Sequence, residues 1–249
     1  MSDTVLHRRD GALLVLTLNR PAKKNAFSDE QWVALREALR EAGADDGVRA
    51  VLLTGAGGNF CSGVDINDMV AAGADHPFES CARAVAFFEK PLLAAATGVA
   101  VGGGATLLLH CDVIYVGSSL RMRFPFVNLG LVPEFASSYM LQAIVGARQA
   151  AELMYTAEWI DGERAVATGI ATACFADELV LERALAKGRE IAQWPLNALR
   201  ETKRTLKSHQ REALERAFRV ETEGMLRQAR SPENIEAMMA FLEKRAPRW

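Results

Sequence analysis

The first part of the chain alternates between apolar runs and one amphipathic stretch. In VLHRRDGALLVLTLN, two β-like runs are separated by Asp10 and Gly11, a dipeptide that favours a tight turn. In SDEQWVALREALREAG, the apolar residues recur with helical period, and Ser28 and Gln31 have the spacing of a capping box. The pattern predicts an antiparallel hairpin followed by a helix.

Further along, short apolar runs alternate with helix-like stretches. The runs are VRAVLLTG, LLAAATGV, DVIYVGS and GIATACF, and their near-continuous apolar character is typical of strands covered on both faces. One intervening helix is predicted in FESCARAVAFFEK, after a polar segment around residues 73–77 that we expect to be mobile. The alternation implies right-handed crossovers, so we predict an α/β fold with a largely parallel sheet.

The pattern becomes helical from about Asp177 to the end, with Pro195 and Pro232 at breaks between amphipathic segments. We therefore predict two regions. Residues 1–190 would form an α/β core with the functional site, and residues 191–249 a C-terminal helical region that packs on another subunit.

Composition narrows the functional classes. The 249 residues include 29 Lys and Arg against 31 Asp and Glu, without the broad positive face that nucleic acid requires. No apolar run approaches the ~20 residues of a membrane helix, and the N-terminus lacks a signal-peptide pattern. We expect a cytoplasmic protein without nucleic-acid or membrane partners. The four cysteines and four histidines lack metal-ligand spacing, which predicts free thiols, no metal site and no role for a histidine.

Two glycine-rich loops, GAGGNFCSGVD and GVAVGGGA, follow the first two buried runs. Neither fits a nucleotide-binding loop, because Phe60 replaces the third glycine of a dinucleotide fingerprint and the phosphate-loop lysine is missing. The glycines could simply allow close packing. However, ligands of α/β proteins bind at the carboxyl ends of parallel strands, and each loop should begin a helix whose first N–H groups lack partners. Two such groups converging on one carbonyl oxygen would form an oxyanion hole.

Five motifs resemble the crotonase superfamily of enoyl-CoA hydratases and isomerases in their order and spacing. They are NRPAKKNAF, NFCSGVDI, GVAVGGGATLLLHCDVIY, LGLVPE and ATGIAT, and the resemblance runs from about Leu13 to the final AFLEKRAP. It implies a ββα spiral core with C-terminal helices that form a homotrimer or a dimer of trimers. It also implies an acyl-CoA thioester substrate with no separate cofactor, since coenzyme A is part of the substrate.

The resemblance also assigns residues. It makes the backbone N–H groups of Val64 and Gly103 the oxyanion donors. It places the adenine and phosphates of CoA near residues 23–26 and 62–66, and it brings a C-terminal lysine to the phosphates. The implied substrate-binding residues are Lys23, Lys24, Ala26, Ser62, Gly63, Asp65, Ile66, Gly102, Thr106, Phe126 and Lys244.

The residue types at two positions argue against hydration. Hydratases of this family grip a water molecule with two glutamates, and the matching positions here are Thr106 and Phe126. Threonine is a poor base at neutral pH, and phenylalanine would exclude water from the β-carbon. The usual syn-hydration is therefore disfavoured.

Glu134 lies in LGLVPEFASS, among apolar and small residues. Taken alone, an acid beside Pro133 suits the first turn of a helix. The stretch also resembles 3-enoyl to 2-enoyl-CoA isomerases, where the matching glutamate is the single base. A helix N-terminus would favour the carboxylate form and apolar neighbours the neutral acid. We favour a catalytic Glu134, with hydration, thioester hydrolysis, decarboxylation and non-catalytic acyl-CoA binding as alternatives.

Other acidic residues have structural interpretations. Asp65 would start a helix or lie on the adenine side, Asp112 would brace a strand, and Asp161 would cap a helix. Asp68 and Glu79 are candidates for the wall of the acyl pocket.

Overall fold

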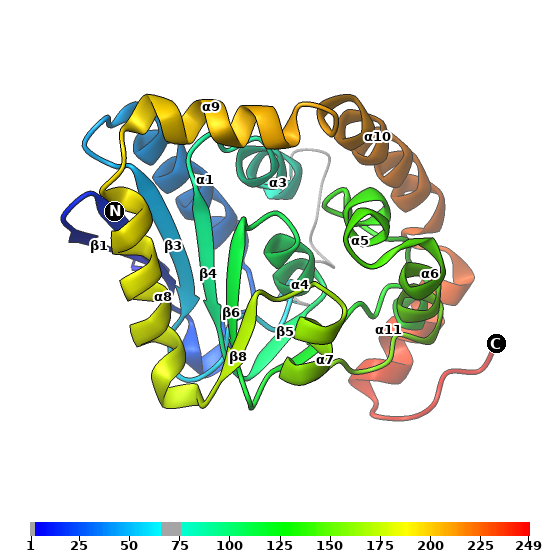
Figure 1. Cartoon of the computed structure of the whole chain (residues 1–249). Coiled ribbons are helices and arrows are strands. Elements are labelled where there is room, and N and C mark those ends of the chain that lie inside the picture. The colour runs from blue at the N-terminus through cyan, green and yellow to red at the C-terminus, as the bar shows by residue number, and fades with distance from the viewer. Residues whose placement is uncertain (1–2, 66–75) are drawn as a thin grey trace.

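The main sheet has six strands in the order β1-β2-β3-β4-β6-β8 in the computed structural model, which describes residues 3–65 and 76–249 (Figure 1). The predicted hairpin is confirmed, because β1 pairs antiparallel with β2. The later strands pair in parallel, as predicted. The strands are β1 (Val5–Asp10), β2 (Leu13–Leu18), β3 (Ala50–Gly55), β4 (Leu92–Ala96), β6 (Val113–Gly117) and β8 (Ala173–Phe175).

A second sheet pairs β5 (Val99–Val101) with β7 (Arg121–Arg123) in parallel. It is absent from the sequence prediction, because three-residue strands are too short to show a hydrophobic period. The first glycine loop joins it, since the N–H of Cys61 donates to Val99 O at 3.0 Å and the N–H of Val101 donates to Cys61 O at 2.9 Å. The two glycine loops therefore run side by side.

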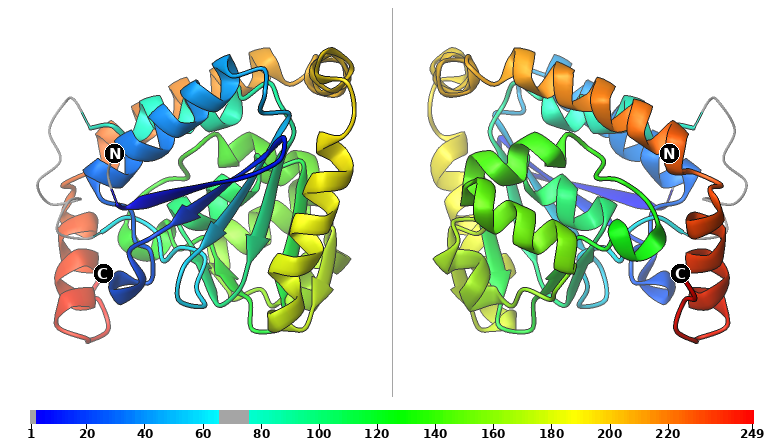
Figure 2. Two further views of the ribbon diagram at one scale, coloured as in Figure 1. Left: turned by 90° about the vertical axis from the view of Figure 1, so that its left-hand side faces the viewer. Right: turned by 90° about the vertical axis from the view of Figure 1, so that its right-hand side faces the viewer.

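The helices cover both faces of the main sheet. Alternate residues of β3 face different cores: Leu52 packs with α8, whereas Val51 and Leu53 belong to the larger core with α1, α3 and α4. Figure 2 shows α8 alone along one side of the sheet. The prediction of strands buried on both faces is thus confirmed for β3 and β4, whereas the edge strand β8 is half-buried. These helices are α1 (Asp29–Ala44), α3 (Phe78–Ala86), α4 (Gly103–Leu108) and α8 (Asp177–Ala192).

The remaining helices include those of the predicted C-terminal region. Pro195 directly precedes α9, and Pro232 is the first residue of α11, so both predicted breaks and the C-terminal helical region are confirmed. The elements are η1 (Pro21–Lys23), η2 (Val127–Leu129), α5 (Ser137–Val145), α6 (Ala147–Thr156), α7 (Gly162–Ala167), α9 (Leu196–Lys207), α10 (Arg211–Gln228) and α11 (Pro232–Leu242). The division of the chain at residue 190 stays a prediction.

The predicted caps form, with one correction. The hydroxyl of Ser28 accepts from the N–H of Gln31 at 3.3 Å, and Asp161 accepts from the N–H of Arg164 at 2.8 Å. The side chain of Gln31 does not complete the capping box. It is buried and donates to Thr4 O at 2.8 Å, so a tertiary contact replaces the local one.

Asp112 braces a strand, as predicted. Its carboxylate accepts from the N–H of Leu92, the first residue of β4, at 2.8 Å, and it pairs with Lys203 and Lys207 of α9 at 2.7 and 3.0 Å. The contacts tie the C-terminal helices to the sheet.

All four cysteines are free thiols, as predicted. Within residues 3–65 and 76–249, no group of His, Cys, Asp and Glu side chains is arranged to hold a metal ion. None of the helices described there combines the length and apolar character needed to cross a membrane.

Candidate active site

The backbone around Val64 leaves one N–H group without a partner among residues 3–65 and 76–249. The N–H of Phe27 donates to Gly63 O at 2.7 Å, and the N–H of Asp65 donates to Phe27 O at 2.8 Å. Successive N–H groups of an extended segment point to opposite sides, so the N–H of Val64 points away from Phe27. Among the described residues, it donates to no acceptor.

Gly103 supplies a second such group. It is the first residue of α4, where N–H groups have no partner within the helix. The N–H groups of Ala105 and Thr106 donate to Gly102 O at 2.9 Å, but that of Gly103 has no acceptor in the described part of the chain. A Cβ built on Gly102 would lie 4.0 Å from Cα of Gly63, so the two loops are in contact. The structure brings the two predicted oxyanion donors onto adjacent segments.

Glu134 lies against the second of these donors. A Cβ built on Gly103 would lie 3.2 Å from Oε1 of Glu134 and 3.4 Å from the ring of Trp32. The residue keeps some solvent exposure, but its carboxyl group is closely surrounded by protein. Burial, and then the negative charge of Glu221, raise the pKa of Glu134 to about 8. The carboxyl group therefore exchanges a proton near neutral pH.

The interpretation of Glu134 as the first turn of a helix is wrong. Helix α5 begins at Ser137, and its N-cap is Ala136. Phe135 and Ala136 have φ of 64° and 53°, in the left-handed region that breaks a helical path. A turn thus separates Glu134 from α5, and burial outweighs any effect of the helix on its pKa.

The two positions that carry glutamates in hydratases lie in the core. Thr106 is fully buried, and its hydroxyl lies 3.2 Å from Gly102 O and 3.3 Å from Gly103 O. Phe126 is 5% exposed. Neither side chain can ionise, and the threonine hydroxyl bonds to its own helix.

The segments predicted to bind CoA are neighbours. Ser62 donates through its N–H to Lys24 O at 3.0 Å and through its hydroxyl to Lys23 O at 3.1 Å. The side chains of Lys23 and Lys24 are exposed, whereas Ala26 is buried. Asp65 pairs with Arg20 at 3.0 Å.

Of the remaining candidates, Lys244 and Glu79 are described, but two others are not. Lys244 is exposed and follows the end of α11. Glu79 pairs with Arg83 on α3 at 2.9 Å. Ile66, Asp68 and most of the predicted mobile segment lie outside the described residues.

Asn25 anchors the first segment predicted to bind CoA, a role that the sequence pattern does not predict. It is fully buried with φ of 57°, a conformation that asparagine tolerates. Its amide donates to Ala56 O at 2.9 Å and Asn59 O at 2.7 Å, and it accepts from the N–H of Arg20 at 2.9 Å. The available signal is its place in NRPAKKNAF, two positions before Phe27 in a polar loop.

Asn25→Asp should destabilise the protein, because two carbonyl oxygens would face a carboxylate in place of an amide donor. We expect a loss of ~2–4 kcal/mol in the free energy of unfolding, which lowers Tm by roughly 5–15 °C. Thermal denaturation measures the shift. The same change at exposed Asn128 is the control and should alter stability by less than ~0.5 kcal/mol. Equal effects at both positions would contradict the anchoring role.

An aromatic cluster lies beside Gly103 and Glu134. Trp32 stacks on Phe27 with ring centroids 3.6 Å apart, and Phe78 meets Trp32 and Phe135 edge-on at 5.3 and 5.7 Å. Sequence periodicity predicts Trp32 only as a core residue of α1. Its contact with Gly103 places it beside the candidate site as well.

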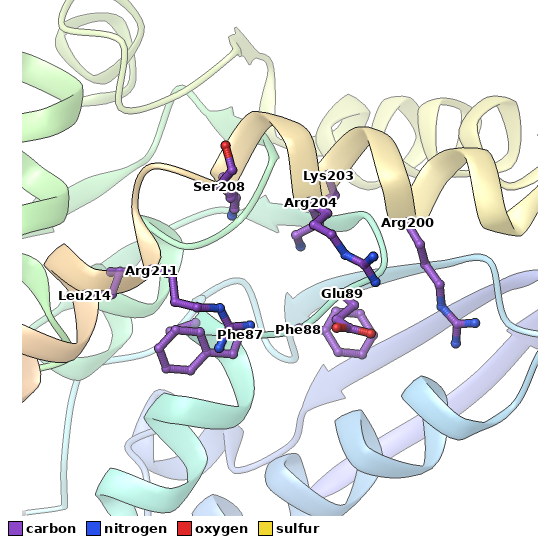
Figure 3. A pocket seen from close by; sticks show the side chains of 11 residues that line it. Phe87, Phe88, Glu89, Arg200, Lys203, Arg204, Ser208, Arg211 and Leu214 are labelled. Atoms are coloured by element: carbon purple, nitrogen blue, oxygen red, sulfur yellow. The ribbon is translucent and has the colours of Figure 1, made fainter.

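A cavity of about 340 Å³ lies elsewhere, between α9 and the loop after α3 (Figure 3). Its lining includes Phe87, Phe88, Arg200, Arg204 and Arg211, and none of the predicted site residues. Arg211 lies over the ring of Phe87, and Arg200 bonds to Gly43 O at 2.8 Å. Two of the arginines that line the cavity therefore already interact with other protein groups. The contact between the two glycine loops and the contact of Gly103 with Glu134 locate the candidate site better than this cavity does.

Comparison with known proteins shows the family of the chain. The chain matches the family model for enoyl-CoA hydratase/isomerase over residues 8–249. It is 30% identical to 1,2-epoxyphenylacetyl-CoA isomerase of Escherichia coli, covering 100% of this chain and 99% of that protein. It is 32% identical to 2,3-dehydroadipyl-CoA hydratase of the same organism, covering 99% of this chain and 98% of that protein.

A solved structure shows the same fold over the whole chain. The crystal structure of an enoyl-CoA hydratase/isomerase from Pseudoalteromonas atlantica is similar with a TM-score of 0.96 and 34% identity, covering 99% of this chain and 100% of that one. The expected spiral fold is confirmed. The chain therefore belongs to the enoyl-CoA hydratase/isomerase family of the crotonase superfamily, as an enzyme that processes acyl-CoA thioesters.

Proposed function

We propose that the protein is an enoyl-CoA isomerase that converts 3-enoyl-CoA to 2-enoyl-CoA. The observation that carries this proposal is the contact of the Glu134 carboxyl group with Gly103, one of two backbone donors on adjacent loops. The hydratase glutamates are replaced by Thr106 and Phe126. One carboxylate can move a proton between two carbons, whereas hydration by the usual pair requires two.

The reaction uses the backbone and Glu134 in sequence. The N–H groups of Val64 and Gly103 donate to the thioester oxygen, and each such donor is worth ~2.7–4 kcal/mol in the transition state. Glu134 removes a proton from the α-carbon, and the electron pair passes into the thioester to form a dienolate. The dienolate then takes the same proton at the γ-carbon. The double bond has moved, and no atom has been gained or lost.

The electrostatic environment of Glu134 suits both halves of this transfer. A group that must accept and then donate a proton works best when its pKa is near the working pH. Burial raises the pKa of Glu134 to about 8, which brings the acid and the base forms close in free energy at neutral pH. General acid–base help of this kind is worth ~10²- to 10⁴-fold in rate.

The pH profile should follow the ionisation of Glu134. Only its carboxylate form can accept the α-proton, so kcat/KM should rise with pH and level off above about 8. At pH 6 we expect kcat/KM to be about 100-fold below the plateau, because each pH unit below the pKa lowers the carboxylate fraction about tenfold. Initial rates with 3-hexenoyl-CoA from pH 6 to 9.5 measure this dependence. A flat profile would show that another group is the base.

Hydration is the second candidate, because one similar protein is the E. coli 2,3-dehydroadipyl-CoA hydratase. Incubation of the purified protein with 3-hexenoyl-CoA and with 2-hexenoyl-CoA separates the two reactions. The isomerase proposal predicts 2-hexenoyl-CoA from the first substrate and little 3-hydroxyhexanoyl-CoA from either. Faster formation of 3-hydroxyhexanoyl-CoA would overturn it. Acyl-CoA binding without any turnover would instead identify a non-catalytic binder.

We also propose that the protein assembles as a homotrimer or a dimer of trimers. Large apolar side chains in the C-terminal helical region are exposed in the single chain, which supports an interface there. They include Leu206, Leu226, Phe241, Leu242 and Trp249. Sedimentation of a monomer at micromolar concentration would refute this assembly.

A further inference from the structure

Glu221 caps the helix that follows Glu134, although the two acids are 87 positions apart in the sequence. It lies on α10, which contacts α5 (Figure 1). Its carboxylate accepts from the N–H of Ala136 at 2.6 Å and from the N–H of Ser138 at 2.8 Å. The N-cap residue of α5 is Ala136, and its side chain makes no capping hydrogen bond. The residue is only 6% exposed, so the contact is a buried one.

The capped turn is strained. Phe135 and Ala136 both have positive φ, and such non-glycine conformations cost ~1–3 kcal/mol each unless the surroundings hold them. Glu221 holds the turn on one side. On the other side, Nε2 of His110 lies 2.7 Å from Phe135 O. Burial lowers the pKa of His110 to about 4, so the ring is neutral, and Nε2 carries the hydrogen because a carbonyl oxygen only accepts.

Helix α10 approaches the same segment through close packing. A Cβ built on Gly224, one turn after Glu221, would lie 3.1 Å from Cγ2 of Val132. Asn234 of α11 donates to Leu129 O at 2.7 Å. The C-terminal helices therefore hold residues 129–138 at several points, and Glu221 holds the turn that follows Glu134.

We propose that Glu221 is a positioning residue for Glu134. The carboxylate of Glu221 fixes the strained turn that directs Glu134 to Gly103, and its negative charge acts on Glu134. This inference rests on the proposed function. It gives Glu221 no contact with the substrate. It makes Glu221 the acid at the start of α5, whereas the sequence taken alone suggested Glu134 for the first turn of a helix.

Among the described titratable groups near Glu134, Glu221 is the one that carries a charge. Cys61 of the first glycine loop is near, but burial raises the pKa of its thiol to about 12, so it is neutral. His110 is neutral as well. Burial raises the pKa of Glu221, and the two N–H groups that donate to its carboxylate partly oppose this by favouring the ionised form. Its charge is the electrostatic influence that adds to burial in raising the pKa of Glu134.

The test compares Glu221→Gln with a matched control on the same helix. Glutamine keeps the size of the side chain and one acceptor oxygen, but it loses the charge and turns an NH₂ group toward one N–H donor. Glu215→Gln makes the same chemical change at a residue that is half exposed and pairs with Arg83. Steady-state kinetics with 3-hexenoyl-CoA and the titration of Glu134 are measured for both variants. The titration is followed by NMR with glutamate labelled with ¹³C at Cδ, and Glu134→Gln identifies the signal.

We expect Glu221→Gln to lower kcat roughly 10- to 100-fold at the optimal pH, the effect of misplacing a catalytic group by up to about 1 Å. KM should change less than twofold. Glu134 should titrate at a lower pH than in the wild type, because the neighbouring negative charge is gone. Glu215→Gln should match the wild type in all three. A merely structural role for Glu221 would lower thermal stability but leave the titration of Glu134 unchanged.

Glu221→Asp keeps the test decisive if the glutamine variant does not fold. It retains the charge with a shorter reach, so Glu134 should titrate near its wild-type pH while kcat still falls. Unchanged kcat and unchanged Glu134 titration in either folded variant would overturn the proposal. If the wild type does not isomerise 3-hexenoyl-CoA, the proposed function fails, and the NMR titration still decides whether Glu221 acts on Glu134.

Discussion

Replacing Glu134 with glutamine should remove isomerase activity while leaving acyl-CoA binding intact. The amide has nearly the shape of the carboxyl group, but it cannot accept the α-proton, so we expect kcat to fall ~10²- to 10⁴-fold. The backbone donors of Val64 and Gly103 stay in place, so the affinity for saturated hexanoyl-CoA should change less than about threefold. Stopped assays of product formation and titration calorimetry measure the two quantities.

The same variant should be more stable than the wild type at alkaline pH. The pKa of Glu134 rises from 4.5 in the unfolded chain to about 8 in the folded one, so the folded state binds more protons between these values. Wild-type stability should therefore fall as pH rises from 4.5 to 8, and Glu134→Gln should not show this loss. A gain in Tm that grows from pH 5 to pH 9 would mark Glu134 as a functional residue kept at a cost in stability.

In the kinetic assay, activity of Glu134→Gln close to that of the wild type would exclude Glu134 as the base.

Gly103→Pro should remove one oxyanion donor without destroying the helix. Proline is favoured at the first position of a helix, which Gly103 occupies in α4, and it has no N–H. We expect kcat to fall ~10²- to 10³-fold, because loss of one oxyanion donor costs about that much. Circular dichroism checks the fold, and steady-state kinetics measure the loss.

Gly103→Ala is the matched control, because it adds the Cβ and keeps the N–H. That Cβ would meet Oε1 of Glu134 at 3.2 Å and the ring of Trp32 at 3.4 Å, so some crowding is expected. Its activity loss should stay below roughly tenfold. If alanine and proline reduce kcat equally, the effect comes from crowding, and the N–H of Gly103 is not an oxyanion donor.

The Glu134 segment depends on helices that the sequence places in a separate region. Glu221 and Asn234 both come from residues 191–249, and both bond to the backbone of residues 129–138. Truncation of this region would therefore disturb the candidate site within a single chain. Oligomer contacts and site formation are compatible roles for the same helices.

The sequence by itself determined the local elements and the class of fold. Unbroken apolar runs predict strands covered on both faces, and the caps at Ser28 and Asp161 require only neighbouring residues. The second glycine-rich loop indicates free backbone N–H groups, because it begins α4, whereas the residues after Asp65 lie outside the described part of the chain. These features depend on interactions within about four residues, so a linear pattern can report them.

Only the tertiary structure decided what surrounds each candidate residue. The turn at Phe135 and Ala136 removes Glu134 from α5, and it persists because Glu221 and His110 bond to it from distant positions. Gln31 leaves its capping box for Thr4 for the same kind of reason. The proton affinity of Glu134 depends on burial and on the charge of Glu221, and both arise when segments far apart in the chain pack together.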